Sequence, residues 1–288
     1  MTDFITRFAP SPTGLLHLGH AFSALTAYEA ARKKDGAFIL RIEDIDAGRC
    51  KPEFEQAIYD DLEWLGLSWL TPVRRQSDHF KDYENALAVL RNKGLVYRCF
   101  KTRKEVAEAI ASAPHLSPDG PEGPQYFGEP LTPNKEKEYL RKGQAFAWRL
   151  NIKKAIEATR NLNGPLFFTE EGAGPKGETG EVTATPEVFG DAIIARKDAR
   201  TSYHIASVVD DALQGVTHII RGEDLFHATH LHRLLQILLD LPAPIYHHHR
   251  LITDENGARL SKRDQSITLR ALREDGATPQ DIRKRLGF

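Results

Sequence analysis

Two short segments of the sequence combine side chains that bind phosphate. In the first, His17 and His20 flank Gly19, which is small enough to let a nucleotide approach the backbone. The second follows the turn-like residues 254–257 and consists of Leu260, Ser261, Lys262 and Arg263. An imidazole can donate a hydrogen bond to a phosphate oxygen, and a lysine on a loop can reach one as a point charge. Together the segments predict a site that binds the phosphates of a nucleotide.

Each segment also has an ordinary structural interpretation. Two histidines three residues apart occur at helix starts without any ligand, and such a short pattern has a high false-positive rate. A lysine after a turn is more often a solvated basic residue. The presence of both segments, in this order and each in a suitable setting, favours the nucleotide site.

The first segment lies where a loop becomes a helix within an α/β pattern. Residues 4–9 read as a short strand, which leads through a loop rich in Pro and Gly to a helix over 20–33 and a strand over 37–42. This order is typical of a parallel sheet, whose ligands bind at the carboxyl ends of the strands. The helix start adds unpaired N–H groups and the positive end of the helix dipole near His17. We therefore predict an α/β fold with a Rossmann-type parallel sheet.

The middle of the chain has a different texture from its two ends. Helices are predicted over 52–65, with Pro52 as the first residue, and over 80–90. Pro and Gly then become frequent, especially in 114–133 and 170–180, which indicates an inserted α+β module. The expected organisation is a first catalytic half (1–100), the insertion (101–190), a second catalytic half (191–250), and a loop with a short helical C-terminus (251–288).

The composition is typical of a globular protein from a reducing compartment. The 288 residues carry a formal net charge of −1 at pH 7, so charge balance alone neither supports nor excludes an RNA partner. Cys50 and Cys99 lie far apart, which does not indicate a disulfide framework. The N-terminus has no signal-peptide pattern, and the most apolar stretch, 231–244, is too short to span a bilayer. We predict a soluble, cytoplasmic monomer.

Longer blocks around the two segments resemble class I aminoacyl-tRNA synthetases, and within them the glutamyl and glutaminyl group. In order along the chain, these blocks are residues 7–20, 41–46, 190–191, 203–211, 215–224 and 260–263. The resemblance implies a class I synthetase catalytic domain that uses ATP with Mg²⁺. It also implies attack of the glutamate α-carboxylate on the α-phosphorus of ATP, which gives glutamyl-adenylate and pyrophosphate. No side-chain nucleophile is needed.

The resemblance assigns residues to both substrates. For L-glutamate they are Arg7, Ser11, Glu43, Tyr203 and Arg221. For ATP they are Pro10, Gly19, His248, Leu260, Ser261, Lys262 and Arg263, with His17, His20 and Lys262 as the catalytic groups. The chemistry fits an acidic amino acid, because the planar donor fork of an arginine pairs well with a carboxylate and rejects glutamine. A surface ion pair is the alternative for Arg7 and Glu43, and we favour it for Asp44 and Asp46.

The sequence ends at Phe288, shortly after Arg263, where glutamyl-tRNA synthetases continue into an anticodon-reading region. We therefore expect no such region here. A catalytic body of this kind without it resembles glutamyl-queuosine tRNA(Asp) synthetases, which activate glutamate without tRNA and esterify it onto queuosine at the wobble position of tRNA(Asp). The alternatives are a fragment of a discriminating glutamyl-tRNA synthetase, a small-molecule adenylyltransferase and a non-catalytic RNA-binding paralogue.

The insertion departs from that family at a zinc site of the form Cys-x-Cys followed by Tyr-x3-Cys. Cys99 and Tyr126 are present, but Lys101 and Pro130 occupy the positions of the other two cysteines. One thiolate and one phenol cannot complete a structural zinc site, and the spacing of His115 does not recommend it as a further ligand. We predict that the protein holds no zinc and that packing stabilises the insertion.

Two groups of histidines also suggest a metal site, and we predict that neither binds one. Consecutive strand residues point to opposite faces, so His247, His248 and His249 cannot all face one ion. We keep His248 as the nucleotide contact and place its two neighbours on the strand surface. The second group, which we predict to form a solvated or packed helix face, consists of His227, His230 and His232.

Overall fold

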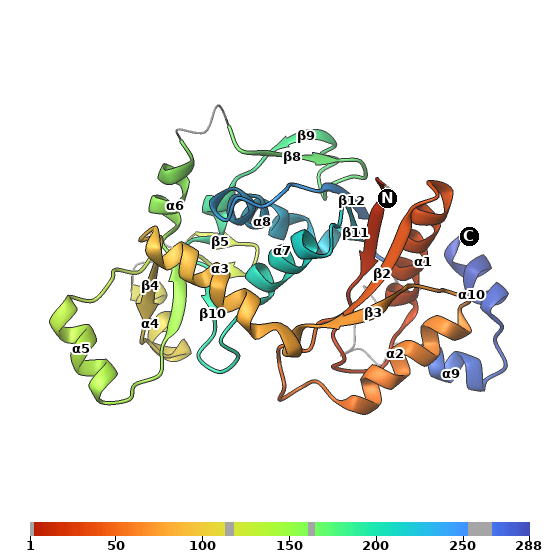
Figure 1. The fold of residues 1–288 in the computed structure, drawn as a ribbon, viewed down its shortest axis with the longest axis horizontal. Helices are drawn as coiled ribbons and strands as arrows, with labels where there is room; N and C mark the ends of the chain where they lie inside the picture. The colour runs from red at the N-terminus through yellow and green to blue at the C-terminus, as the bar shows by residue number, and fades with distance from the viewer. Residues whose placement is uncertain (1–2, 113–117, 161–164, 253–266) are drawn as a thin grey trace.

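The computed structural model describes residues 3–112, 118–160, 165–252 and 267–288, and its centre is a seven-stranded sheet (Figure 1). The strand order is β3-β2-β1-β11-β12-β8-β9. The strands are β1 (Ile5–Phe8), β2 (Ala37–Ile42), β3 (Leu70–Arg75), β8 (Phe167–Glu170), β9 (Gly180–Thr183), β11 (His218–Gly222) and β12 (Ile245–His249). Neighbouring strands are parallel except for β8 and β9. The predicted α/β fold with a Rossmann-type sheet is confirmed.

Helices join the strands of this sheet and cover it. They are α1 (Leu18–Lys33), α2 (Pro52–Trp64), α3 (Phe80–Asn92), α7 (Tyr203–Leu213) and α8 (Phe226–Leu238), followed after β12 by α9 (Leu269–Glu274) and α10 (Pro279–Leu286). Short 3-10 helices occur at η1 (Gln76–His79), η3 (Pro186–Phe189) and η4 (Glu223–Leu225). Pro52 begins α2 as predicted, because a proline at the first helical position has no N–H that would need a partner. No described helix is both long and apolar enough to cross a membrane.

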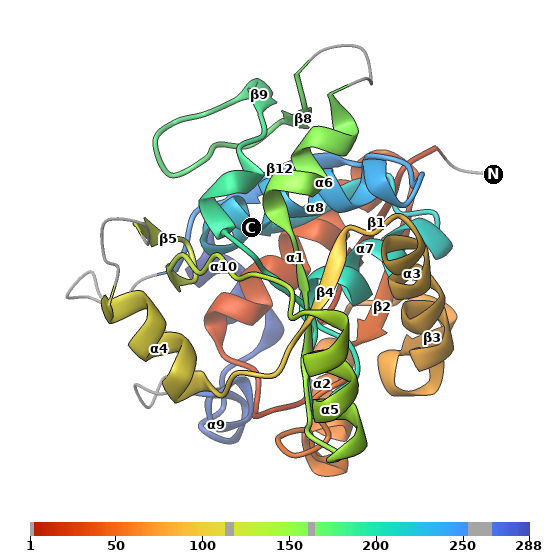
Figure 2. The same cartoon turned by 90° about the vertical axis from the view of Figure 1, so that its left-hand side faces the viewer.

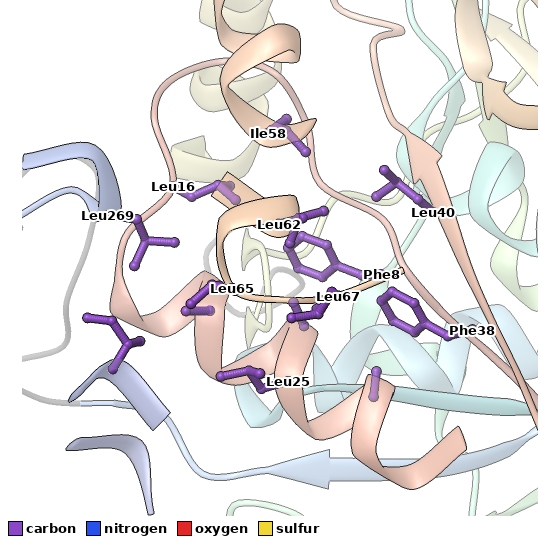
Figure 3. Packing of buried hydrophobic residues seen from close by; sticks show 14 of the residues in the cluster. Phe8, Leu16, Leu25, Phe38, Leu40, Ile58, Leu62, Leu65, Leu67 and Leu269 are labelled. Carbon is purple, nitrogen blue, oxygen red and sulfur yellow. The ribbon is translucent and has the colours of Figure 1, made fainter. Parts of the chain in front are cut away.

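The C-terminal segment packs on the same apolar core as the first helix. Figure 3 shows Leu16, Leu25, Leu62 and Leu269 converging from segments far apart in the sequence, and all four are almost completely buried. The backbone N–H of Leu269 also donates to the carbonyl of Leu16 at 2.8 Å. Burial of a leucine side chain contributes roughly 1.5–3 kcal/mol, so these contacts fix the start of α9 against the segment that leads into α1.

A second, three-stranded sheet in the order β10-β7-β4 organises the inserted part (Figures 1 and 2). Its strands are β4 (Val96–Cys99), β7 (Ala147–Leu150) and β10 (Ile193–Ala195). Around it are α4 (Arg103–Ser112), the short strands β5 (Asp119–Gly120) and β6 (Gly123–Pro124), α5 (Pro133–Arg141) and α6 (Ile152–Thr159). These elements lie at the left of Figure 1 and face the viewer in Figure 2.

The two sheets do not follow the boundaries expected at residues 100 and 190. Strands β4 and β10 lie outside that range but pair with β7, whereas β8 and β9 lie inside it and extend the central sheet beyond β12. The expected boundaries came from the density of Pro and Gly, which marks loops and carries no information on which strand pairs with which. The composition therefore located the irregular segments and misplaced the division between the sheets.

Candidate active site

A cleft of about 400 Å³ opens at the carboxyl ends of the central parallel strands. This is where ligands bind in open α/β sheets. Its lining includes most of the predicted site residues, namely Arg7, Pro10, Ser11, His17, Gly19, His20, Glu43, Tyr203 and Arg221. The predicted residues Leu260, Ser261, Lys262 and Arg263 lie outside the described part of the chain.

The two histidines of the first segment cap the N-terminus of α1. Nδ1 of His17 accepts the backbone N–H of Gly19 at 3.1 Å, and Nδ1 of His20 accepts that of His17 at 3.2 Å. A nitrogen that accepts from an N–H group carries no proton, so each neutral ring carries its proton on Nε2. The rings lie 3.8 Å apart, and a Cβ on Gly19 would come within 3.0 Å of the His17 ring. Both rings line the cleft, and among the N–H groups of the helix start, that of Gly19 is bonded to His17.

Arg7 is fixed in the floor of the cleft by a buried network of charges. Its Nε donates to Oδ1 of Asp211 at 3.0 Å, and the completely buried Arg41 donates to the same oxygen at 2.8 Å. Burial on its own would raise the pKa of Asp211, but Arg41 and Arg7 lower it below its ordinary value. Asp211 therefore stays ionised, and two guanidinium groups share its charge. Arg41 also pairs with Glu43 and Asp210, so Arg7 is the cation of this network that lines the cleft.

Glu43 is one of two acidic residues in the lining of the cleft, the other being Asp224. Its backbone N–H donates to the carbonyl of Pro10 at 3.0 Å, which places Glu43 beside Ser11. Its Oε1 accepts from Arg41 at 3.3 Å. Burial raises the pKa of Glu43, while Arg41 and Arg7 act in the opposite direction. A cation next to Glu43 would favour the ionised carboxylate further, so the position suits an ammonium group.

Arg221 is oriented by partners on four segments. Its Nε donates to Nε2 of His248 at 3.1 Å, and one terminal nitrogen donates to the carbonyl of Leu225 and to Oγ1 of Thr229. The other terminal nitrogen donates to the hydroxyl of Tyr203 at 3.1 Å. This nitrogen has a second N–H, and the Tyr203 hydroxyl, which accepts from Arg221, has its own proton to donate. Together they form a pair of donors suited to one carboxylate.

The structure corrects part of the assignment made for the histidines of β12. His248 is buried, donates from Nδ1 to Glu170 and accepts from Arg221, so it positions Arg221 and does not line the cleft. Burial, together with the charge of Arg221, lowers the pKa of His248 to about 4. His249, predicted to be surface, is buried, lines the cleft and accepts from Ser23 at 2.8 Å. The nucleotide contact of His248 stays a prediction, and His249 is the histidine of β12 that lies at the cleft.

Both ends of the segment that contains Lys262 are anchored at the cleft. On one side, Leu251 and Ile252 line the cleft, and the N–H of Leu251 donates to Glu223. On the other side, Thr268 forms a β-bridge with His17. The described residues on either side of 253–266 therefore both lie at the cleft that is lined by the histidines of α1.

Several residues that build the site were not identified as such from the sequence. Asp210 accepts from Arg74, Gln76 and Tyr83 and is completely buried. The sequence did contain a signal for a buried ion-pair network. It places an arginine in the apolar strand β2 and two adjacent aspartates in the apolar helix α7, and charged residues are almost never fully buried unless they are paired. The local sequence does not say which residues pair with them.

Asp44 and Asp46 have different roles, although both were predicted to form surface ion pairs. Asp46 pairs with Arg49 and Arg196 near the surface, as expected. Asp44 is buried and accepts from both the backbone N–H and the hydroxyl of Ser77, at 2.8 and 2.6 Å. Asp44 also pairs with the half-exposed Arg75 at 3.2 Å, so the predicted ion pair is present, but its carboxylate is buried and holds η1 against the loop that carries Glu43.

The insertion is packed around the residues that would flank a zinc ion. Cys99 and Tyr126 are buried in one small apolar cluster, and Nζ of Lys101 lies 5.7 Å from the Tyr126 ring. Pro130 is exposed. Among the described residues, no group of three or more His, Cys, Asp or Glu side chains is placed to bind a metal. The absence of zinc stays a prediction, since His115 lies outside these residues.

Histidines 230 and 232 lie on the packed face of α8, whereas His227 is exposed, in agreement with the expected solvated or packed helix face. Burial lowers the pKa of His230 to about 4 and that of His232 well below its ordinary value. His232 is therefore neutral next to Tyr203, whose ring centroid lies 5.4 Å away. It contributes packing and no charge to the wall behind the donor pair.

Comparison with known families agrees with the geometry of the cleft. The family model for tRNA synthetases class I (E and Q), catalytic domain, matches residues 3–287. The chain belongs to this family and is an ATP-dependent ligase of the class I aminoacyl-tRNA synthetases.

Individual relatives define its similarities more closely. A Rhodobacter capsulatus protein named glutamyl-Q tRNA(Asp) synthetase is 47% identical over 99% of this chain and 100% of that protein. The glutamate–tRNA ligase of Aquifex aeolicus is 36% identical over 98% of this chain and 56% of the ligase. A solved glutamate tRNA ligase from Elizabethkingia meningosepticum, in complex with its amino acid, has a TM-score of 0.78 and 25% identity, over 99% of this chain and 60% of that one. The chain thus spans less than two thirds of these two ligases.

Proposed function

We propose that this protein activates L-glutamate with ATP and transfers the glutamyl group to queuosine at the wobble position of tRNA(Asp). One observation carries the proposal. The donor pair of Arg221 and Tyr203 lies in the same cleft as His17 and His20, which cap α1. It brings a carboxylate site and a phosphate site together in one cleft.

Glutamate binds with its two charged ends on opposite partners. The side-chain carboxylate accepts from Arg221 and Tyr203, with Arg7 as the second positive group. The α-ammonium pairs with Glu43, and Ser11 adds a hydrogen bond. Because burial raises the pKa of Tyr203, its hydroxyl stays protonated and remains a donor. Glutamine would place an uncharged amide against Arg221 and is therefore disfavoured.

ATP occupies the other half of the cleft, next to Pro10 and Gly19. The Nε2–H groups of His17 and His20 donate to its phosphate oxygens, and Lys262 stabilises charge on the leaving side. An oxygen of the glutamate α-carboxylate attacks the α-phosphorus, and the bond from that phosphorus to the bridging oxygen of the β-phosphate breaks. Pyrophosphate leaves with that electron pair. Mg²⁺ would enter on the phosphates of ATP, whose oxygens suit it, and would neutralise part of their charge.

The glutamyl group then passes from the adenylate to a hydroxyl of the queuosine base, and AMP leaves. The similarity to the Rhodobacter protein over the whole length of both chains supports this acceptor. We also place the protein in the cytoplasm as a monomer, and its two free cysteines are compatible with a reducing compartment.

Two measurements test the proposal. ATP–pyrophosphate exchange with glutamate, run without RNA, should proceed, and exchange with glutamine should be far slower. Labelled glutamate supplied with tRNA(Asp) should then appear in the anticodon loop, only when queuosine is present. Label on the 3′ adenosine would instead identify a glutamyl-tRNA synthetase, and no exchange without RNA would contradict the first step.

A further inference from the structure

A second hollow lies between α3, β7 and the segment that joins β10 to α7. It has a volume of about 670 Å³, and its charged and aromatic lining includes Lys81, Arg91, Trp148, Arg196, Lys197 and Arg200. A third hollow of about 460 Å³ shares Arg196 and Arg200 with it and extends to residues 45–48. We call the second hollow the basic groove, whereas the third hollow is also lined by Asp46, Glu84 and Asp198. Residues 45–48 begin two positions after Glu43, so the third hollow connects the basic groove with the loop that forms one wall of the catalytic cleft.

Positive charge dominates the second hollow, although the whole chain is almost neutral. Glu84 is the acidic residue in its lining and lies 3.7 Å from Lys81. Arg196 is neutralised by Asp46 and Asp198. In the described part of the chain, Arg91, Lys197 and Arg200 form no ion pair with a carboxylate, and all three are exposed. Local cations of this kind attract a polyanion even when the net charge of the protein is close to zero.

Arg91 also provides a flat surface for stacking. Its guanidinium carbon lies 4.9 Å from the centroid of the Trp148 ring, and that of Arg98 lies 4.6 Å from the same ring. Trp148 is half-buried, and Phe146 packs edge-on against it at 5.6 Å. The guanidinium group of Arg91 thus already lies against an aromatic ring before any ligand binds. Unpaired RNA bases stack on guanidinium planes as well as on aromatic rings.

We propose that the basic groove binds single-stranded RNA beside the nucleotide that receives glutamate. One unpaired base stacks on Arg91, while Lys81, Lys197 and Arg200 contact the neighbouring phosphates. The strand then continues past residues 45–48 into the catalytic cleft. This inference rests on the proposed RNA substrate. It identifies the surface that would bind the unpaired bases of an RNA loop.

Direct binding tests the groove independently of catalysis. The probe is a fluorescently labelled anticodon stem–loop RNA of tRNA(Asp), titrated with the full chain while anisotropy is recorded. Arg91→Gln combined with Arg200→Gln should raise the Kd at least tenfold. The logarithm of the binding constant falls with the logarithm of the salt concentration, with a slope of roughly −0.7 for each phosphate that the protein neutralises on single-stranded RNA. The slope of the double variant should therefore be shallower by about 0.7 for each phosphate contact that is lost. Arg32→Gln on α1 is the matched control, since Arg32 is also exposed and lies outside the groove.

A second variant separates stacking from charge. Arg91→Lys keeps the positive charge and removes the plane, so it should raise the Kd severalfold and leave the salt slope unchanged. All variants should retain RNA-independent pyrophosphate exchange within twofold of wild type, which shows that the fold and the cleft are intact. An unchanged Kd and salt slope in the double variant, with exchange preserved, would overturn the groove. If the wild type transferred labelled glutamate to the 3′ adenosine, the proposed function would be contradicted, but the measured binding of RNA to the groove would still hold.

Discussion

Replacement of Arg221 by lysine tests how the cleft recognises glutamate. In the folded protein, all but one of the guanidinium N–H groups of Arg221 are bonded to protein acceptors on β12, α8 and the turn before it, or to Tyr203. The N–H that is left lies on the nitrogen that also bonds Tyr203. A lysine keeps the positive charge, but its single ammonium cannot satisfy these fixed acceptors and the substrate at the same time.

The size of the effect follows from this arrangement. A hydrogen bond to a charged group contributes about 1.5–3 kcal/mol, and Arg221 donates one such bond to the substrate carboxylate. The substitution also releases the Tyr203 hydroxyl, which is the second donor of the pair. The loss should therefore be close to the upper value, and about 3 kcal/mol corresponds to a change of roughly a hundredfold. We expect the KM for glutamate to rise by that factor and the preference for glutamate over glutamine to decrease.

The assay is ATP–pyrophosphate exchange at varied glutamate concentration, without RNA. Arg233→Lys is the matched control, because Arg233 on α8 donates to the carbonyl of Phe167 and does not line the cleft. Thermal unfolding of both variants shows whether either has lost its fold. A KM for glutamate within threefold of wild type in Arg221→Lys, with the fold intact, would refute the assignment of Arg221 to the carboxylate.

Three further predictions concern other parts of the molecule. Removing one preorganised donor to developing charge costs about 3 kcal/mol, so Lys262→Ala should slow pyrophosphate exchange roughly a hundredfold; unchanged exchange would remove Lys262 from the mechanism. Burial raises the pKa of Asp61 to about 6, so the folded state loses stability as the pH rises through that value. Asp61→Asn should raise the free energy of unfolding by roughly 2 kcal/mol at pH 8 and by almost nothing at pH 4, which urea titrations can compare. Metal analysis of the purified protein should find no zinc, and one zinc per chain would show that the insertion has ligands other than Cys99.

The sequence predicted those parts of the site that depend on local order. The strand over 37–42 and the start of α2 at Pro52 were located correctly, because alternation, spacing and a proline at the first turn are local signals. The helix after His17 begins at Leu18, two residues earlier than predicted. The reason is that His17 and His20 form the cap themselves, a role more usual for Ser, Thr, Asp or Asn.

The buried charges could not be placed from sequence, because their partners lie far apart along the chain. Arg41 on β2 and Asp211 on α7 form a direct ion pair, although the whole insertion lies between them in the sequence. The burial of His249 was missed for a related reason. Three identical neighbours give a strand no recognisable inner and outer face. The β11–β12 register, in which Arg221 pairs with His248, decides which of them points inward.

The same register explains how glutamate recognition and nucleotide binding are linked through β12. His248 orients Arg221 on one side of this strand, and the next residue, His249, lines the cleft and bonds Ser23 of α1 on the other. A shift of the strand by one residue would exchange these two side chains and disturb both halves of the cleft at once. The side chain of Glu170 prevents this by accepting from both the backbone N–H and the ring of His248. Glu170→Gln should therefore weaken binding of glutamate and of ATP together in the exchange assay, and an effect on ATP alone would show that Glu170 does not act through Arg221.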